Sequence, residues 1–216
     1  MSKVRQAVAF AILLCFAVVL VSCGGSKPAP VTTEQPKPVA EVKPPSPYTA
    51  KACLSRMADM AARWQMDAMP VRLESTINDE ASGIDGKSTV WTATFASPSR
   101  RSMKTFTCSG SRLKDAPPFG VSGGGETPYG ASAIVRAFQP LYVQVDSDKA
   151  FSIAQEHGGA ALLKKDAKQP VYYLLALDTQ TGKELTWYVS YGSDLKKTAG
   201  IGIIDAATGK YLRAAK

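Results

Sequence analysis

The chain has 216 residues, of which 26 are Lys or Arg and 18 are Asp or Glu, so its formal net charge is +8. The basic residues are scattered and form no continuous stripe, which argues against nucleic acid as a partner. The chain has one histidine, His157, and four cysteines, so it offers few groups for a transition-metal site or a His-dependent nucleophile. We therefore predict no catalytic residues, no metal site and no cofactor.

The first 22 residues have the pattern of a secretion signal. Lys3 and Arg5 precede an apolar run over residues 7–21. This run has the length of a signal core and is shorter than the ~20 residues that span a bilayer. We predict a signal peptide over residues 1–22, so the rest of the chain would lie outside the cytoplasm.

The signal ends in Leu20-Val21-Ser22-Cys23, which resembles the bacterial lipobox. The resemblance implies a bacterial lipoprotein that is cleaved before Cys23, carries diacylglycerol on that sulfur and bears a further acyl chain on the freed amine. Several acyl chains give stable membrane anchoring. Gly24 after the cysteine implies the outer membrane, facing the periplasm. The alternative is an ordinary signal peptide that ends in a chance cysteine.

Residues 23–47 are rich in proline, holding seven of the 14 prolines of the chain. Proline disfavours helices and central strands, so we predict a lipidated, disordered, extended tether. Beyond it, Cys53 and Cys108 remain once Cys15 and Cys23 are assigned to the signal and the anchor. In an oxidising compartment such a pair predicts a disulfide. The alternative is two buried free thiols.

Residues 48–112 show the pattern of a first α+β unit. Apolar residues recur at helical spacing up to Trp64, Pro70 ends that helix, and strands are predicted at 71–75, 89–95 and 103–108. Residues 113–140 hold Pro and Gly runs and are predicted to be a flexible connection. Their Gly run lacks the Gly-Lys-Ser/Thr ending of a phosphate-binding loop.

Residues 141–216 predict a second α+β unit. A strand is expected at 141–145 and a helix capped by Asp146-Ser147, with Gly158-Gly159 ending or interrupting that helix. Further strands are expected at the following positions: 171–177, 185–191, 200–204 and a short segment at 211–212.

The two halves share a sequence pattern. Gly86–Trp91 matches Gly182–Trp187 at a constant offset of 96 residues. Similar turns and the same order of elements favour an internal duplication over a chance match. The predicted fold class is therefore α+β, with two repeated units that each pack a helix on a small antiparallel sheet.

Residues 147–210 resemble the PepSY pattern, through the helix at 147–154, the pair Gly158-Gly159, and the final Ile203-Ile204-Asp205-Ala206-Ala207-Thr208-Gly209. The resemblance implies a PepSY-like, cystatin-like arrangement of a helix before an antiparallel sheet. It also implies binding or inhibition of peptidases, and it brings no catalytic residues.

The predicted function is a membrane-anchored binding module of the cell envelope, with peptidase inhibition or regulation as one form of that role. Its partner would be an unidentified envelope protein or peptide. Trp91 and Trp187 are predicted to be core residues. Candidates for an exposed sheet face are Tyr172 or Tyr173, and Tyr188. One alternative is an assembly lipoprotein that docks onto a larger envelope complex. Another is a hydrolase built on His157, which is otherwise a solvated cation near a helix end.

Overall fold

The computed structural model describes residues 44–128, 136–178 and 183–215, which belong to one compact unit. Its strands form a single antiparallel sheet in the order β4-β3-β2-β1-β5-β6-β7-β8. The elements in chain order are α1 (Ala50–Trp64), β1 (Met69–Ser75), β2 (Val90–Ser97), β3 (Ser102–Ser109), β4 (Gly120–Pro128), η2 (Pro140–Tyr142), α2 (Ser147–Ala154), η3 (Gln155–Gly159), α3 (Ala160–Lys165), β5 (Val171–Leu177), β6 (Leu185–Gly192), β7 (Thr198–Asp205) and β8 (Tyr211–Ala215).

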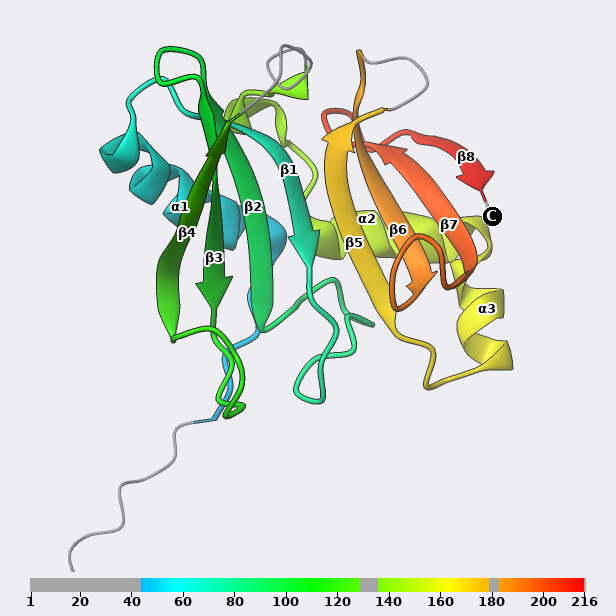
Figure 1. The fold of residues 1–216 in the computed structure, drawn as a ribbon. Coiled ribbons are helices and arrows are strands. Elements are labelled where there is room, and N and C mark those ends of the chain that lie inside the picture. Colours follow the sequence, from blue (N-terminus) through cyan, green and yellow to red (C-terminus); the bar gives the residue numbers. More distant parts are fainter. Residues whose placement is uncertain (1–43, 129–135, 179–182, 216) are drawn as a thin grey trace, which may run out of the picture. The chain divides into compact units, whose positions relative to one another are not determined.

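The long helices lie behind the sheet in the view of Figure 1. Helix α1 contacts β1, β2 and β3, whereas α2 contacts β6 and β7. The buried positions of α1 recur at helical spacing because one face of this helix packs on the sheet; they are Ala50, Cys53, Leu54, Met57 and Ala61.

The predicted arrangement of two repeated units with separate small sheets is wrong. Strand β1 pairs with β5 through Leu73↔Leu175 and Glu74↔Leu174, so the strands of both halves belong to one eight-stranded sheet. The pairing satisfies backbone groups that two separate sheets would leave at exposed edges. Residues 113–140 consequently do not separate two sheets.

Two tryptophans occupy corresponding places in the core, as predicted. Trp91 and Trp187 are both fully buried. The indole N–H of Trp91 donates to the carbonyl of Tyr48 over 2.8 Å, and that of Trp187 donates to the carbonyl of Val145 over 2.9 Å. Each tryptophan thereby fixes the chain just before a helix while its ring fills the space beneath that helix.

The predicted disulfide is confirmed: Cys53 of α1 is bonded to Cys108 of β3, with the two Cα atoms 5.6 Å apart. The bond fastens α1 to the sheet. Cys23, the predicted signal peptide over 1–22 and the predicted tether up to residue 43 lie outside the described residues.

Two local predictions were also wrong. Residues 120–128, expected within a flexible connection, form the edge strand β4, which pairs with β3. An edge strand gains backbone hydrogen bonds even where its side chains are small or absent, so the Gly-rich sequence concealed it. Residues 141–145, expected as a strand, instead contain part of the 3₁₀ turn η2, which begins at Pro140.

Candidate functional site

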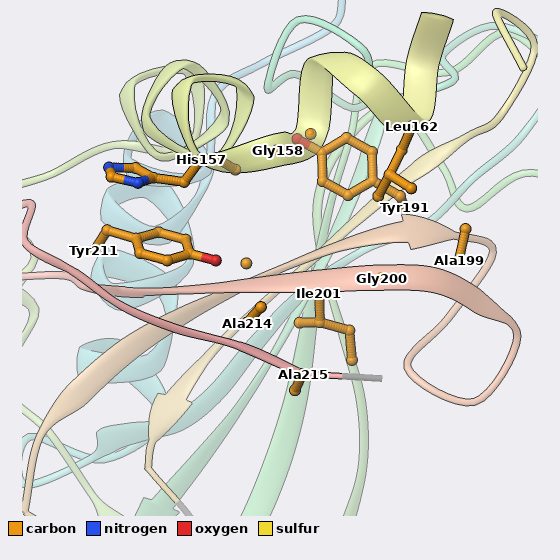
Figure 2. A pocket seen from close by; sticks show the side chains of 13 residues that line it. His157, Gly158, Leu162, Tyr191, Ala199, Gly200, Ile201, Tyr211, Ala214 and Ala215 are labelled. Carbon is orange, nitrogen blue, oxygen red and sulfur yellow. The ribbon is translucent and has the colours of Figure 1, made fainter. Parts of the chain in front are cut away.

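A cavity of about 390 Å³ lies between the helical segment η3–α3 and strands β6, β7 and β8 (Figure 2). Its volume falls within the range of about 300–1,000 Å³ that is typical of ligand pockets. The residues that define its shape are His157, Gly159, Leu162, Tyr191, Gly202 and Ala214.

The cavity exists because small residues face one another across it. On the sheet, Val189 pairs with Gly202 and Gly202 pairs with Ala214, so the two strands nearest the edge contribute only glycine and alanine to this row. Paired residues of antiparallel strands share a face. A Cβ added to Gly202 would lie 3.2 Å from the Cβ of Ala154 in α2, which places this row on the face that the helices cover.

The opposite wall is a π-helical turn. The backbone leaves helical geometry at His157 and Gly158, and the φ of Gly158 is 108°, a value that favours glycine. A Cβ added to Gly159 would lie 1.7 Å from the hydroxyl of Tyr191, so only glycine permits this close approach. The prediction that Gly158-Gly159 ends or interrupts the helix is confirmed, and π-helical turns are frequent at functional sites.

The interruption holds His157 at one end of the cavity. Its imidazole stacks on the ring of Tyr211 in β8, with centroids 4.1 Å apart and planes 10° apart. Figure 2 shows the two rings lying one above the other. Among the described residues, the imidazole makes no hydrogen bond to a Ser, Asp or Glu side chain. The exposed His157 was singled out from the sequence, whereas Tyr211, which lies within a short predicted segment, was missed.

Tyr191 forms a neutral part of the cavity wall. Its hydroxyl oxygen accepts a hydrogen bond of 2.7 Å from Nε2 of Gln155. Burial raises the pKa of Tyr191 to about 12, and the hydrogen bond from Gln155 opposes this shift only in part. The phenol therefore keeps its proton at neutral pH and brings no charge to the cavity.

Other residues singled out from the sequence lie elsewhere. Tyr172 and Tyr188 do occupy the sheet face opposite the helices, but they are 7% and 8% exposed and pack in a second apolar cluster. These candidates for an exposed face are therefore buried, as is Tyr173 in the main core. The second cluster closes over the rings of Tyr172 and Tyr188 because other apolar side chains pack against them; these are Leu174, Ile201, Ile203, Ile77, Leu195 and Leu212.

The described residues contain no group of three or more His, Cys, Asp or Glu side chains placed to hold a metal ion. Within the same residues, no helix is both long enough and apolar enough to cross a membrane.

No protein-family model matches the sequence, and no curated protein matches it significantly. Among solved structures, a crystal structure of a "putative lipoprotein" from Clostridium difficile 630 aligns with 81% of this chain and 95% of its own, at a TM-score of 0.49 and 14% identity. A likeness at this level does not define a shared family. The resemblance to the PepSY pattern rests on residues 147–210 alone.

Proposed function

We propose that this chain is a lipid-anchored lipoprotein of the bacterial cell envelope whose folded part is a non-catalytic binding module. The anchor is supported by the signal-like residues 1–22 and by Leu20-Val21-Ser22-Cys23. Gly24 after the cysteine supports the outer membrane, facing the periplasm. The disulfide between Cys53 and Cys108 agrees with an oxidising compartment.

The observation that supports a binding role best is the cavity beneath η3. Its walls are chiefly glycine, alanine and aliphatic side chains, and its buried Tyr191 is neutral. Glycine is needed at Gly159, and Gly202 adds no side chain to the floor, so in the folded chain these two glycines help to form the hollow. Such walls suit a chiefly apolar ligand, which gains free energy by leaving water.

The surroundings of His157 support binding over hydrolysis. A Ser-His-Asp site requires the imidazole to accept a proton from a serine while a carboxylate orients it. In the described residues His157 stacks on Tyr211 instead, and no Ser or carboxylate is hydrogen-bonded to it. Inhibition of a peptidase would be one form of binding through this site.

The cavity is tested with a probe whose aromatic rings are apolar and whose sulfonate is charged, and the response is detected at single residues. The full chain is placed in nanodiscs of neutral phosphatidylcholine, labelled with ¹³C in its Leu and Ala methyl groups, and titrated with 8-anilinonaphthalene-1-sulfonate. We expect saturable shifts of the Leu162 and Ala214 methyl signals and no shift for Leu54, a buried residue of α1 that does not line the cavity. Equal responses at Leu54 and Leu162, or none at either, would refute the cavity as a binding site.

A second candidate, an assembly lipoprotein that docks onto a larger envelope complex, is favoured by one observation. Leu141 and Tyr142 of η2 are adjacent and 76% and 59% exposed. Exposed apolar neighbours favour a protein contact. The variant Leu141→Asp/Tyr142→Asp should then reduce the size of the detergent-extracted particle in sedimentation, whereas Ala214→Phe should leave it unchanged. An unchanged size in the double variant would count against docking through η2.

A further inference from the structure

The cavity opens at a free edge of the sheet. Among the residues that the structure describes, β8 is the outermost strand and pairs only with β7. Alternate residues of an edge strand direct their N–H and C=O groups away from the sheet, where another strand can bind them. The other edge, β4, carries Glu126, Pro128 and an irregular register against β3, which are devices that discourage pairing.

Strand β8 also has a register shift, between Ile203 and Ile204, but the half beyond that shift is regular, and its charged side chain, Arg213, is paired with Asp178. The last three pairs of β8 with β7 are Ile203↔Arg213, Gly202↔Ala214 and Ile201↔Ala215. No proline lies in Tyr211–Ala215. A strand added beside β8 would therefore meet an edge of ordinary geometry with small side chains at its end.

The register of β8 decides where a side chain of that added strand would go. The row Val189, Gly202, Ala214 crosses β6, β7 and β8 on the helix-covered face. A residue opposite Ala214 on an added strand would continue this row, because opposed residues share a face. Its side chain would enter the cavity between β8 and η3, which at about 390 Å³ has room for a leucine or phenylalanine side chain.

The elements around the cavity carry five lysines, of which Lys197 interacts electrostatically with Asp194 of its own hairpin. Helix α3 ends in Lys164 and Lys165, the β6–β7 hairpin carries Lys196 and Lys197, and the β7–β8 turn carries Lys210. None of these lysines is among the ion pairs between described residues. None of the described residues that line the cavity is acidic. This charge distribution favours a partner with acidic groups on either side of an apolar one.

We propose that β8 receives an extended acidic peptide segment as a ninth strand, and that this segment inserts an apolar side chain opposite Ala214 into the cavity. The inference rests on the proposed binding function and names its ligand as polypeptide. Main-chain hydrogen bonds to the edge supply affinity, and the cavity supplies specificity for the inserted side chain. An anionic lipid surface would bind through the lysines alone and would use neither the regular strand edge nor the cavity. The presence of both beside the lysines therefore favours a peptide.

The test uses defined peptides and the full chain in neutral nanodiscs. Fluorescent nonapeptides alternate Glu and Thr around a central Leu or a central Ala, and a third peptide has the central Leu with N-methylated neighbouring amides. Fluorescence anisotropy should show the Leu peptide binding about tenfold more tightly than the Ala peptide. The N-methylated peptide should bind more weakly than its parent, because it cannot complete the pairing.

Matched protein variants locate the site. Ala214→Phe fills the cavity from an exposed edge position and should abolish the preference for Leu, whereas Ala214→Ser should keep it. Thr127→Phe, an exposed position on the opposite edge strand β4, is the control and should also keep it. Circular dichroism verifies that each variant is folded.

Three results would overturn the peptide proposal: equal binding of the Leu and Ala peptides, full binding of the N-methylated peptide, or an unchanged Leu preference in Ala214→Phe. Complete displacement by phosphatidylglycerol vesicles with no preference among the peptides would assign the lysines to a lipid surface instead. The methyl titration with 8-anilinonaphthalene-1-sulfonate separates the two proposals. If Leu162 responds to that probe but the peptides fail, the cavity remains a binding site and only its assignment to a peptide is wrong.

Discussion

The side chain of Ser147 joins the starts of two helices. Its buried Oγ accepts a 2.9 Å hydrogen bond from the backbone N–H of Ala50, the first residue of α1, although Ser147 itself begins α2. Asp146 acts in the same way, since its Oδ1 accepts from the backbone N–H groups of both Lys51 and Ser147. The first turns of α1 and α2 therefore share caps, which bind the two halves of the chain together behind the single sheet.

Ser147→Ala should lower the free energy of unfolding by about 1–2 kcal/mol, because it leaves the N–H of Ala50 buried without a partner. The measurement is urea unfolding followed by circular dichroism. Ser152→Ala is the matched control, since Ser152 is exposed on the same helix and its hydroxyl donates only to the carbonyl of Asp148. Equal losses of unfolding free energy in the two variants would show that the cap shared by α1 and α2 does not stabilise the fold.

Replacing both bridged cysteines, Cys53→Ser with Cys108→Ser, should lower the free energy of unfolding by roughly 4 kcal/mol on the chain-entropy account of a 55-residue separation. The bond restricts the unfolded chain, and it also fixes α1 on β3. Urea unfolding of the wild type with and without reductant provides the control. A double variant as stable as the oxidised wild type would contradict a stabilising role for the bridge.

Stability should fall in acid through Glu74, at the β1–β5 junction. Burial alone would raise the pKa of Glu74, but its hydrogen bonds with Arg72 and Tyr172 outweigh burial and leave the pKa below its usual value. A lowered carboxyl pKa contributes stability that is present above the unfolded value of 4.5 and is lost as pH falls through the folded value.

Glu74→Gln should therefore flatten the acid side of the plot of unfolding free energy against pH. Urea unfolding at a series of pH values from neutral downward measures this. Asp59→Asn, on the exposed face of α1, controls for the change in net charge. If unfolding free energy has the same slope against pH below 4.5 in Glu74→Gln and in the wild type, Glu74 does not contribute to the loss of stability in acid.

Gly159→Ala should destabilise the chain by about 1–3 kcal/mol, the usual cost of overpacking. The φ of Gly159 is −59°, so alanine is conformationally acceptable there, and the cost arises from the 1.7 Å approach of its Cβ to the Tyr191 hydroxyl. Gly125→Ala in β4, where an added Cβ meets no atom within 4 Å, is the control. Thermal unfolding that ranks the two variants equally would mean that η3 shifts freely away from β6.

Cys23→Ala should leave the folded part intact and release it from the membrane, because the acyl chains predicted on Cys23 would be absent. Membrane fractionation after a high-salt wash measures the effect, and Cys15→Ala within the signal region is the control. Retention of Cys23→Ala in the washed membrane would refute the anchor.

Local periodicity was sufficient to predict α1 and most strands. The expected strand at 171–177 coincides with β5, and that at 185–191 with all but the last residue of β6. The pairing of β1 with β5 was not predictable, because it joins Leu73 to Leu175 across the chain and leaves no local pattern. β4 was missed for a different reason, since its glycines have low strand propensity and are held by the neighbouring β3.

The cavity, like the pairing of β1 with β5, could be predicted from the sequence only in part. His157 and Gly158-Gly159 were noticed in the sequence because a lone histidine and a glycine pair are unusual. Gly202 and Ala214 carry no chemical signal by themselves, and their effect depends on which residues the register brings opposite them. The disulfide between Cys53 and Cys108 was predictable, because two cysteines that remain in an exported chain usually form a disulfide in an oxidising compartment.

The central claim, that the cavity beside β8 is a binding site for an inserted apolar side chain, is tested most directly by intermolecular nuclear Overhauser effects. The full chain in neutral nanodiscs is bound to the Leu-centred nonapeptide carrying a ¹³C-labelled Leu. We expect contacts from the Leu methyl groups to Ala214 and Leu162, which both line the cavity. Contacts confined to the Gly-rich edge β4, or to the exposed Leu141 and Tyr142, would contradict the account.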